Sequence, residues 1–354
     1  MAAGNAASSS RTGLLQLFVL LALVGIWRGW RQAAVLRPLL AALAAYVVAA
    51  YFLPILAGLD PNSHGMLARL QEGDSLCSSR LTLWRNVLHL IAQKPWLGWG
   101  WGELDYAHFI TPYEGPRFCA ILDNAHNLPL HLAAELGLPL ALLVCGTGFW
   151  LVWRAKPWAE TDAGRQMAWA VLALIMLHSM LEYPLWYGPF QMAFGLCVWI
   201  LWRTGSGVAN HAPLKTPIAL IFIAPVATIL ISCLAYAAWD YQRISQIYLP
   251  PEQRLPAYRE NTLAKLQGSW LFKSQVDFAE LTTTPLNADN AQKLHDMALD
   301  LLHFSPEARV VQILLDSAKL LGREDDARYY AQRYEAAFPK EYAAWLQGQA
   351  NVVQ

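Results

Sequence analysis

The sequence predicts an all-α fold: a polytopic membrane helix bundle of about six segments, with one long loop inserted and a helical C-terminal tail. Two observations predict this class. Hydrophobic residues make up 56% of the 354 positions, and mean hydropathy is +0.27, which exceeds what a soluble domain needs to fill its core. A soluble helical bundle is the alternative, but soluble folds do not place so many wholly apolar helices in series.

Six stretches approach the roughly 20 apolar residues that one helical crossing of a bilayer needs. Pro184 and Pro189 leave the boundary between the fourth and fifth stretches open. Trp and Tyr side chains near the ends of the stretches fit the aromatic belts of membrane interfaces. The stretches cover residues 13–27, 33–57, 128–153, 168–187, 189–202 and 217–239.

Lys and Arg residues in short loops set the expected orientation. They follow the first, third and fifth segments, as at Arg28, Arg154 and Arg203, whereas the short loop around Glu182 has none. The basic loops are therefore expected in the cytoplasm of a bacterial inner-membrane protein, and the long loop and the tail in the periplasm. The expected regions are two membrane helices (1–58), a periplasmic loop (59–127), four membrane helices (128–239) and a periplasmic helical domain (240–354).

The tail is expected to form helices separated by helix breakers. One helix opens at Pro306 and ends at Gly322, and a second runs from about Glu324 to Phe338 before Pro339. This two-helix unit of about 34 residues resembles a tetratricopeptide repeat. An unrelated helical hairpin is the alternative, because such arrays normally need about three repeats for stability.

Residues 78–92 of the long loop predict an amphipathic helix that Pro95 stops. Its expected apolar face consists of Leu81, Trp84, Leu88 and Ile91. Such a helix is expected to lie in the membrane interface, with its basic residues at the height of the lipid phosphates. The glycines of residues 96–102 mimic a nucleotide-binding fingerprint, but no strand and helix flank them, so we interpret this segment as a tight aromatic turn.

A polar cluster marks the point where the loop re-enters the membrane, at Asp123, His126, Asn127 and Glu135. Polar side chains at such a junction are costly unless they are paired or face water. His126 is suited to act as a base or to bind a phosphate; a capping or interfacial histidine is the alternative. No metal site is expected, because the cluster lacks recognised ligand spacing.

Glu182 and Tyr183 place a carboxylate and a phenol at the outer end of the fourth segment. A charged acid near mid-membrane costs about 2.5 to 3.5 kcal/mol, so Glu182 needs a partner. A loop arginine would serve either a structural or a catalytic purpose. Arg80 and Arg85 are candidate diphosphate clamps, because guanidinium groups bind phosphate oxygens in pairs; exposed surface charges are the alternative.

The cysteines divide between the loop and the membrane segments. Cys77 and Cys119 share the expected periplasmic loop, where an oxidising compartment permits a disulfide between them. The remaining cysteines are expected to pack in membrane segments. Net charge is zero and no run of basic residues is present, so nucleic acid is not an expected partner.

Taken together and in order, these motifs resemble the O-antigen ligase and polymerase superfamily. The pieces are Ser-x-Arg-x-x-x-Trp at 78–84, KPWLGWG at 94–100, His-Asn at 126–127 and Glu-Leu-Gly at 135–137. The LEYPLWY run at 181–187 and the helical tail are most similar to the pilin-type O-oligosaccharyltransferase branch. The resemblance covers about residues 60–350.

The resemblance implies transfer of an oligosaccharide from an undecaprenyl-diphosphate carrier to a Ser or Thr hydroxyl of a periplasmic acceptor protein such as pilin, with no cofactor. It also implies that His126 and Arg80 are the catalytic residues. The cytoplasmic loops are too short to build the phosphate site that a sugar-nucleotide enzyme would need. The residues expected to bind substrate are Arg85, Asp123, Asn127, Glu135, Glu182 and Tyr183.

Members of that superfamily carry more membrane helices than the six expected here, which correspond to their C-terminal half. Either a separate chain completes the site, or the chain is a truncated product with reduced or no activity. An O-antigen ligase or polymerase and a non-catalytic membrane scaffold are the alternative functions. A transporter is disfavoured, because no polar groups mark a pathway at the membrane midplane.

Overall fold

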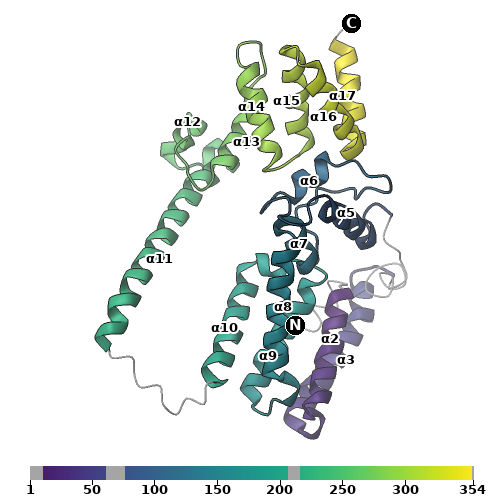
Figure 1. Cartoon of the computed structure of the whole chain (residues 1–354), viewed down its shortest axis with the longest axis vertical. Helices are drawn as coiled ribbons and strands as arrows, with labels where there is room; N and C mark the ends of the chain where they lie inside the picture. Colours follow the sequence, from purple (N-terminus) through teal and green to yellow (C-terminus); the bar gives the residue numbers. More distant parts are fainter. Residues whose placement is uncertain (1–10, 61–75, 206–215, 353–354) are drawn as a thin grey trace. The chain divides into compact units, whose positions relative to one another are not determined.

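A computed structural model describes residues 11–60, 76–205 and 216–352, and all regular structure within these ranges is helical (Figure 1). The all-α prediction is therefore confirmed. The chain divides into two compact units. The first contains Met1–Trp101, Pro116–Phe118 and Asn124–Val208, and the second contains Gly102–Gly115, Cys119–Asp123 and Ala209–Gln354.

The first unit holds the helices on both sides of the re-entry point. α9 packs against α10 and against α2, while α7 packs against α8 and α5 (Figure 1). Its α-helices are α2 (Arg11–Ile26), α3 (Ala33–Leu56), α5 (Arg80–Gln93), α7 (Leu128–Leu136), α8 (Leu138–Ala155), α9 (Ala163–Ser179) and α10 (Gly188–Gly205). Short 3-10 turns are η1 (Gly29–Arg31), η2 (Pro157–Ala159) and η3 (Pro184–Trp186).

Three helices in the described ranges are long and apolar enough to cross a membrane, namely Ala33–Leu56, Leu138–Ala159 and Ala224–Tyr248. Arg11–Ile26 is apolar but shorter. The fourth expected segment is the 17-residue helix α9, about 25 Å long at 1.5 Å per residue, which is less than the roughly 30 Å of a bilayer core. The expected count of six spans is not confirmed.

The third expected segment is interrupted at Gly137. This glycine has φ +81°, a left-handed conformation, and it separates α7 from α8. Because residues with a Cβ rarely adopt this conformation, glycine is the residue that permits the break. The polar residues of the re-entry point therefore lie on a short helix of their own.

Helix α5 buries one face against the protein and leaves another exposed. Leu83, Val87 and Leu90 are fully buried, whereas Leu81 and Leu88 are 76% and 54% exposed. Of the expected apolar face, Ile91 is buried while Leu81 and Leu88 are exposed, and the expected place of this face in the membrane interface stays a prediction.

Polar groups on α5 explain this difference. Asn86 is buried because its Nδ2 donates to the Pro116 carbonyl (3.1 Å) and its Oδ1 accepts from the Phe118 N–H (2.8 Å). A buried amide that is fully hydrogen-bonded costs little, so an asparagine turns toward the interior. Ser79 caps the start of the helix by accepting from the Thr82 N–H at 3.2 Å.

The second unit combines one long helix with a series of helices that pack in sequence. α14 packs against α15, α15 against α16 and α16 against α17 (Figure 1). Its α-helices are α6 (Leu104–Ile110), α11 (Thr216–Ile244), α12 (Thr262–Leu266), α13 (Lys273–Thr283), α14 (Ala291–Leu302), α15 (Ala308–Leu320), α16 (Glu324–Ala337) and α17 (Pro339–Val352). Short turns are η4 (Ser245–Tyr248), η5 (Pro251–Gln253) and η6 (Pro256–Tyr258).

The core of this unit includes a piece of the long loop. Phe109 of α6 is 2% exposed and belongs to the same buried cluster as Leu294, Leu314 and Tyr334. The expected helix pair is present as α15 and α16, separated by Gly322 at φ +70°. α15 begins two residues after Pro306, and the tetratricopeptide assignment stays a prediction.

Candidate functional site

Three side chains that are distant in sequence meet in the first unit. Arg80, the first residue of α5, forms an ion pair with Glu182 Oε1, and His126 Nδ1 lies 2.7 Å from Glu182 Oε2. The sequence predicts that Glu182 needs a loop arginine as its partner, and Arg80 is that arginine. Glu182 thus joins the two residues that the resemblance marks as catalytic.

Two hydrogen bonds hold the three segments together. Trp84 Nε1 of α5 donates to the Ala125 carbonyl at 3.1 Å, next to His126. Asn127 Nδ2 donates to the Met180 carbonyl at 3.1 Å, in the turn that precedes Glu182. Asn127 also caps α7, because its Oδ1 accepts from the Leu130 N–H at 3.1 Å. It is therefore a positioning residue for the site.

The backbone of His126 is held in an unusual conformation. Its φ is +50°, in the left-handed region, which costs a residue with a side chain about 1–2 kcal/mol. The Asn124 side chain stabilises it, because its Oδ1 accepts from the His126 N–H at 2.9 Å. Asn124 is 3% exposed; sequence reasoning missed it, although the short polar pattern Asp-Asn-Ala-His is typical of a side-chain-supported turn.

The charge of Glu182 decides the tautomer of His126. Burial opposes ionisation of Glu182, but the hydrogen bond with His126 and the charge of Arg80 outweigh it and hold its pKa below the ordinary 4.5. An ionised carboxylate only accepts hydrogen bonds, so His126 Nδ1 carries the proton. The lone pair of a neutral His126 ring is then on Nε2, which has no partner among the described residues.

Aromatic rings line the loop that carries Glu182. The Tyr183 ring lies edge-on to the His126 ring, with centroids 5.0 Å apart, and stacks with Tyr187 at 5.7 Å. Trp186 stacks with Trp101 at 6.2 Å. These contacts place Tyr183 beside the imidazole, and they fix the loop around it.

The glycine-rich turn at residues 96–102 docks against the end of α7. The Trp99 N–H donates to the Ala134 carbonyl at 2.9 Å, and the Gly100 N–H donates to the Glu135 carbonyl at 3.0 Å. A Cβ on Gly98 would lie 2.3 Å from the Glu135 carbonyl oxygen, and a Cβ on Gly137 would lie 2.2 Å from the Trp96 carbonyl oxygen. Both glycines have positive φ, so close backbone approach explains why these positions are glycine.

Glu135 lies behind the site. Its carboxyl is 2% exposed, and its Oε2 is 3.4 Å from His131 Nε2 one turn earlier on α7. The His131 ring packs edge-on against Trp186 at 4.9 Å. This buried pair supports the loop that carries Glu182.

Neither Arg85 nor Asp123, two of the expected site residues, has a side-chain hydrogen bond or ion pair with the group of three in the described ranges. Arg85 is exposed on α5, and at 3.6 residues per turn it lies about 140° around the helix from Arg80. Asp123 is exposed and belongs to the second unit. The expected diphosphate clamp by both arginines stays a prediction.

The cysteines differ in state. Cys77 and Cys119 are disulfide-bonded, whereas Cys145, Cys197 and Cys233 are free thiols. Cys197 is buried and packs in the cluster formed by α9 and α10.

Two family models match successive parts of the chain. Residues 166–352 match the family described as "Virulence factor membrane-bound polymerase, C-terminal", and residues 1–145 match the family described as "O-Antigen ligase". The first match covers more than half of the chain. No solved structure matches the chain significantly.

Two curated relatives are from Acinetobacter baylyi (strain ATCC 33305 / BD413 / ADP1). A general O-oligosaccharyltransferase is 22% identical over 207 residues, which are 55% of this chain and 35% of the relative. A ComP-specific O-oligosaccharyltransferase is 27% identical over 154 residues, which are 42% of this chain and 27% of the relative. The chain thus spans about a third or less of the length of these relatives. By the match of residues 166–352 the chain belongs to the family described as "Virulence factor membrane-bound polymerase, C-terminal", and its residues 1–145 are similar to the O-antigen ligase family.

Proposed function

We propose that this chain takes part in O-linked glycan transfer at the periplasmic face of a bacterial inner membrane. The donor is an undecaprenyl-diphosphate-linked oligosaccharide, and the acceptor is a Ser or Thr hydroxyl of a periplasmic protein such as pilin. The observation that carries this proposal is the Arg80–Glu182–His126 group, which puts an oriented imidazole next to a guanidinium.

His126 is the general base in this proposal. The acceptor hydroxyl oxygen attacks the anomeric carbon, a C–O bond forms, and the bond between that carbon and the diphosphate oxygen breaks. The leaving diphosphate takes the electron pair, and the hydroxyl proton passes to His126 Nε2. Glu182 is a positioning residue, because its carboxylate fixes the Nδ1–H tautomer and stabilises the imidazolium that forms.

Arg80 offsets the charge that develops on the diphosphate. A guanidinium has five N–H donors, so Arg80 can keep its contact with Glu182 and still donate to phosphate oxygens. Preorganised donors aimed at a developing charge are a large contribution to catalysis. No nucleotide or metal enters this scheme.

A second function is supported by the match of residues 1–145 to the O-antigen ligase family. In that reaction the same donor and the same base would serve, but the acceptor would be a sugar hydroxyl of a lipid A core or of a growing glycan. The two functions differ in acceptor alone, so the product decides between them.

Mass spectrometry of periplasmic proteins from cells with and without this chain tests the proposal. Loss of a Ser- or Thr-linked glycan in cells that lack the chain is the expected result. An unchanged periplasmic glycoproteome with shortened lipopolysaccharide would identify the ligase instead. If both fractions are unchanged, the chain has no transfer activity of either kind.

A further inference from the structure

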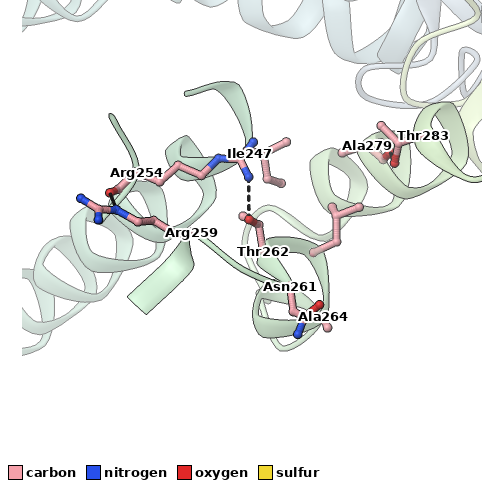
Figure 2. A pocket seen from close by; sticks show the side chains of 9 residues that line it. Ile247, Arg254, Arg259, Asn261, Thr262, Ala264, Ala279 and Thr283 are labelled. Atoms are coloured by element: carbon pink, nitrogen blue, oxygen red, sulfur yellow. Dashed lines mark hydrogen bonds between the residues drawn. The ribbon is translucent and has the colours of Figure 1, made fainter. Parts of the chain in front are cut away.

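A pocket of about 430 Å³ lies in the second unit at the end of a candidate membrane span. Ile247 lines it and also belongs to the span Ala224–Tyr248. Arg254, Arg259 and Thr262 supply most of its polar lining, and Thr283 of α13 contributes a hydroxyl (Figure 2). None of these residues takes part in the proposed transfer reaction.

Arg254 is held in a fixed orientation. Its Nε donates to the Leu249 carbonyl at 2.8 Å, and its Nη1 donates to Thr262 Oγ1 at 2.8 Å. Figure 2 shows the guanidinium extended toward Thr262. Thr262 is 9% exposed, so this end of the pocket is ordered by internal contacts. Nη2 has no partner among the residues that the structure describes, and its donors stay available.

Arg259 places a second cation near the pocket, with its guanidinium extending away from that of Arg254 (Figure 2). Its Nε donates to the Arg254 carbonyl at 3.3 Å, while its terminal nitrogens have no partner in the described ranges. The acidic neighbours Glu252 and Glu260 are exposed, and neither forms an ion pair with either arginine there. The pocket therefore receives the Arg254 guanidinium, and Arg259 adds a second positive charge nearby; neither has a carboxylate partner in the described ranges, which suits a phosphate group.

Aromatic side chains surround the end of the span. The Trp239 and Trp270 rings lie 5.7 and 6.5 Å from the Tyr236 ring, and the Arg243 guanidinium lies 4.4 Å above Trp239. Trp270 is 77% exposed and Tyr248 is 69% exposed. Exposed Trp and Tyr near the end of a span are typical of the membrane–water interface, where basic residues meet lipid phosphates.

We propose that this pocket binds the phosphate of an anionic membrane lipid, and that the contact anchors the base of the second unit to the bilayer surface. The apolar end of the pocket at Ile247 continues the span toward the acyl chains, Arg254 receives the headgroup, and Arg259 adds to the positive potential nearby. A soluble phosphate offers the same oxygens but no apolar part. The proposal does not depend on the glycan-transfer reaction.

Native mass spectrometry of the full chain in detergent tests the pocket. The chain is titrated with phosphatidylglycerol, with phosphatidylcholine, and with phosphatidylglycerol plus millimolar inorganic phosphate. We expect preferential retention of phosphatidylglycerol that inorganic phosphate does not displace. Arg254→Gln and Arg259→Gln should each weaken retention on the order of fivefold, as one basic residue near an anionic surface contributes about that much.

Arg328→Gln is the matched control. Arg328 is an exposed arginine on α16, and its Nη1 lies 4.0 Å from Asp325 Oδ1. This substitution should leave lipid retention unchanged. Arg259→Gln keeps the Arg254 contacts to Leu249 and Thr262, so it remains informative if Arg254→Gln unfolds, as judged by circular dichroism. Unchanged phosphatidylglycerol retention in folded Arg259→Gln, or displacement of the lipid by inorganic phosphate, would overturn the proposal.

Discussion

Helices α8 and α15 are both rich in leucine, but they place it in opposite environments. Leu142 and Leu143 of α8 are 69% and 63% exposed, whereas Leu314 and Leu315 of α15 are at most 1% exposed. Apolar exposure on this scale marks a surface that lipid covers, while burial marks a water-excluded protein core. The same residue type therefore stabilises the first unit through the bilayer and the second through its own packing.

Truncation of one leucine in each helix gives the largest expected effect. Leu315→Ala should destabilise the second unit by about 2–5 kcal/mol, because it leaves a cavity in a packed core. Leu143→Ala should cost less than about 0.5 kcal/mol in detergent, since detergent replaces the lost surface. Amide hydrogen exchange of the full chain in detergent measures both. Equal losses would mean that α8 is packed against protein as tightly as α15.

The second-largest expected effect comes from replacing a glycine where the aromatic turn contacts α7. Gly98→Ala should destabilise the first unit by about 1–3 kcal/mol, because a Cβ there meets the Glu135 carbonyl and a left-handed φ. Gly146→Ala is the matched control, as its Cβ would meet nothing within 4 Å in helix α8. That control should be neutral or stabilise by about 0.5–1 kcal/mol. Thermal unfolding monitored by circular dichroism checks both variants.

Two carboxyl groups extend the contrast between the units. Glu182 of the first unit is paired with Arg80 and His126, and its pKa is lowered. Asp105 of α6, in the second unit, is 9% exposed; burial, with smaller effects of Glu103 and Asp123, raises its pKa to about 7. Pairing favours the charged form and desolvation favours the neutral form, so the two groups respond oppositely to pH.

The sign of each pH effect follows from linkage. For Asp105 the folded pKa exceeds the ordinary 3.8, so its contribution to stability is present below pH 3.8 and is lost as pH rises through about 7. Raising the pH from 4 to 8 should weaken protection of the α6 amides by on the order of 1 kcal/mol, after partial solvation is discounted. Asp105→Asn should remove this dependence in hydrogen exchange, and an unchanged pH profile would refute the assignment.

Glu182 should behave in the opposite sense. Its contribution is present above its ordinary pKa of 4.5 and is lost as pH falls through the lowered folded value. Acidification below pH 4.5 should therefore weaken the contact between α5 and the Glu182 loop. In the same pH range Asp105 is protonated, so its burial destabilises the second unit less. The opposite pH dependences of hydrogen exchange near Glu182 and near Asp105 therefore distinguish the first unit from the second without any substitution.

Sequence alone predicted the helices better than their packing. It predicted that Glu182 needs a loop arginine as its partner, and Arg80 is that arginine, but it did not predict the contact of Glu182 with His126. It could not foresee the buried face of α5, because Leu81 and Leu88 fit an apolar stripe as well as Leu83 and Val87 do. Which stripe is buried depends on where the Asn86 amide finds its partners.

Hydrophobic periodicity missed two further features. The turn of Asn124 and the positive φ of His126 depend on a side-chain hydrogen bond, which periodicity does not reveal. The association of α6 with the helices of the tail joins segments about 200 positions apart, as in the 2.6 Å contact of Glu103 with His303. Long-range pairing of this kind is set by tertiary packing, which propensity does not encode.

The smallest expected effect is that of Arg85→Gln, which is compared with substitution of Arg80 on the same helix. Arg85→Gln should lower glycan transfer no more than about threefold, since an exposed charge contributes less than about 1 kcal/mol. Arg80→Gln should lower transfer about 100-fold or more, because it removes a donor aimed at the leaving group. Quantitative mass spectrometry of the glycosylated product compares them. Equal losses of transfer in the two variants would mean that Arg85 also binds the diphosphate.

The most direct measurement is glycan transfer in cells that express only His126→Ala, beside cells that express only Glu182→Gln, with membrane insertion of both variants verified. His126→Ala should reduce Ser- or Thr-linked glycan on periplasmic proteins at least 100-fold, as expected for loss of a general base. Glu182→Gln should lower transfer and shift its pH profile, because the imidazole loses its carboxylate partner. Wild-type levels of glycan with inserted His126→Ala would contradict the account.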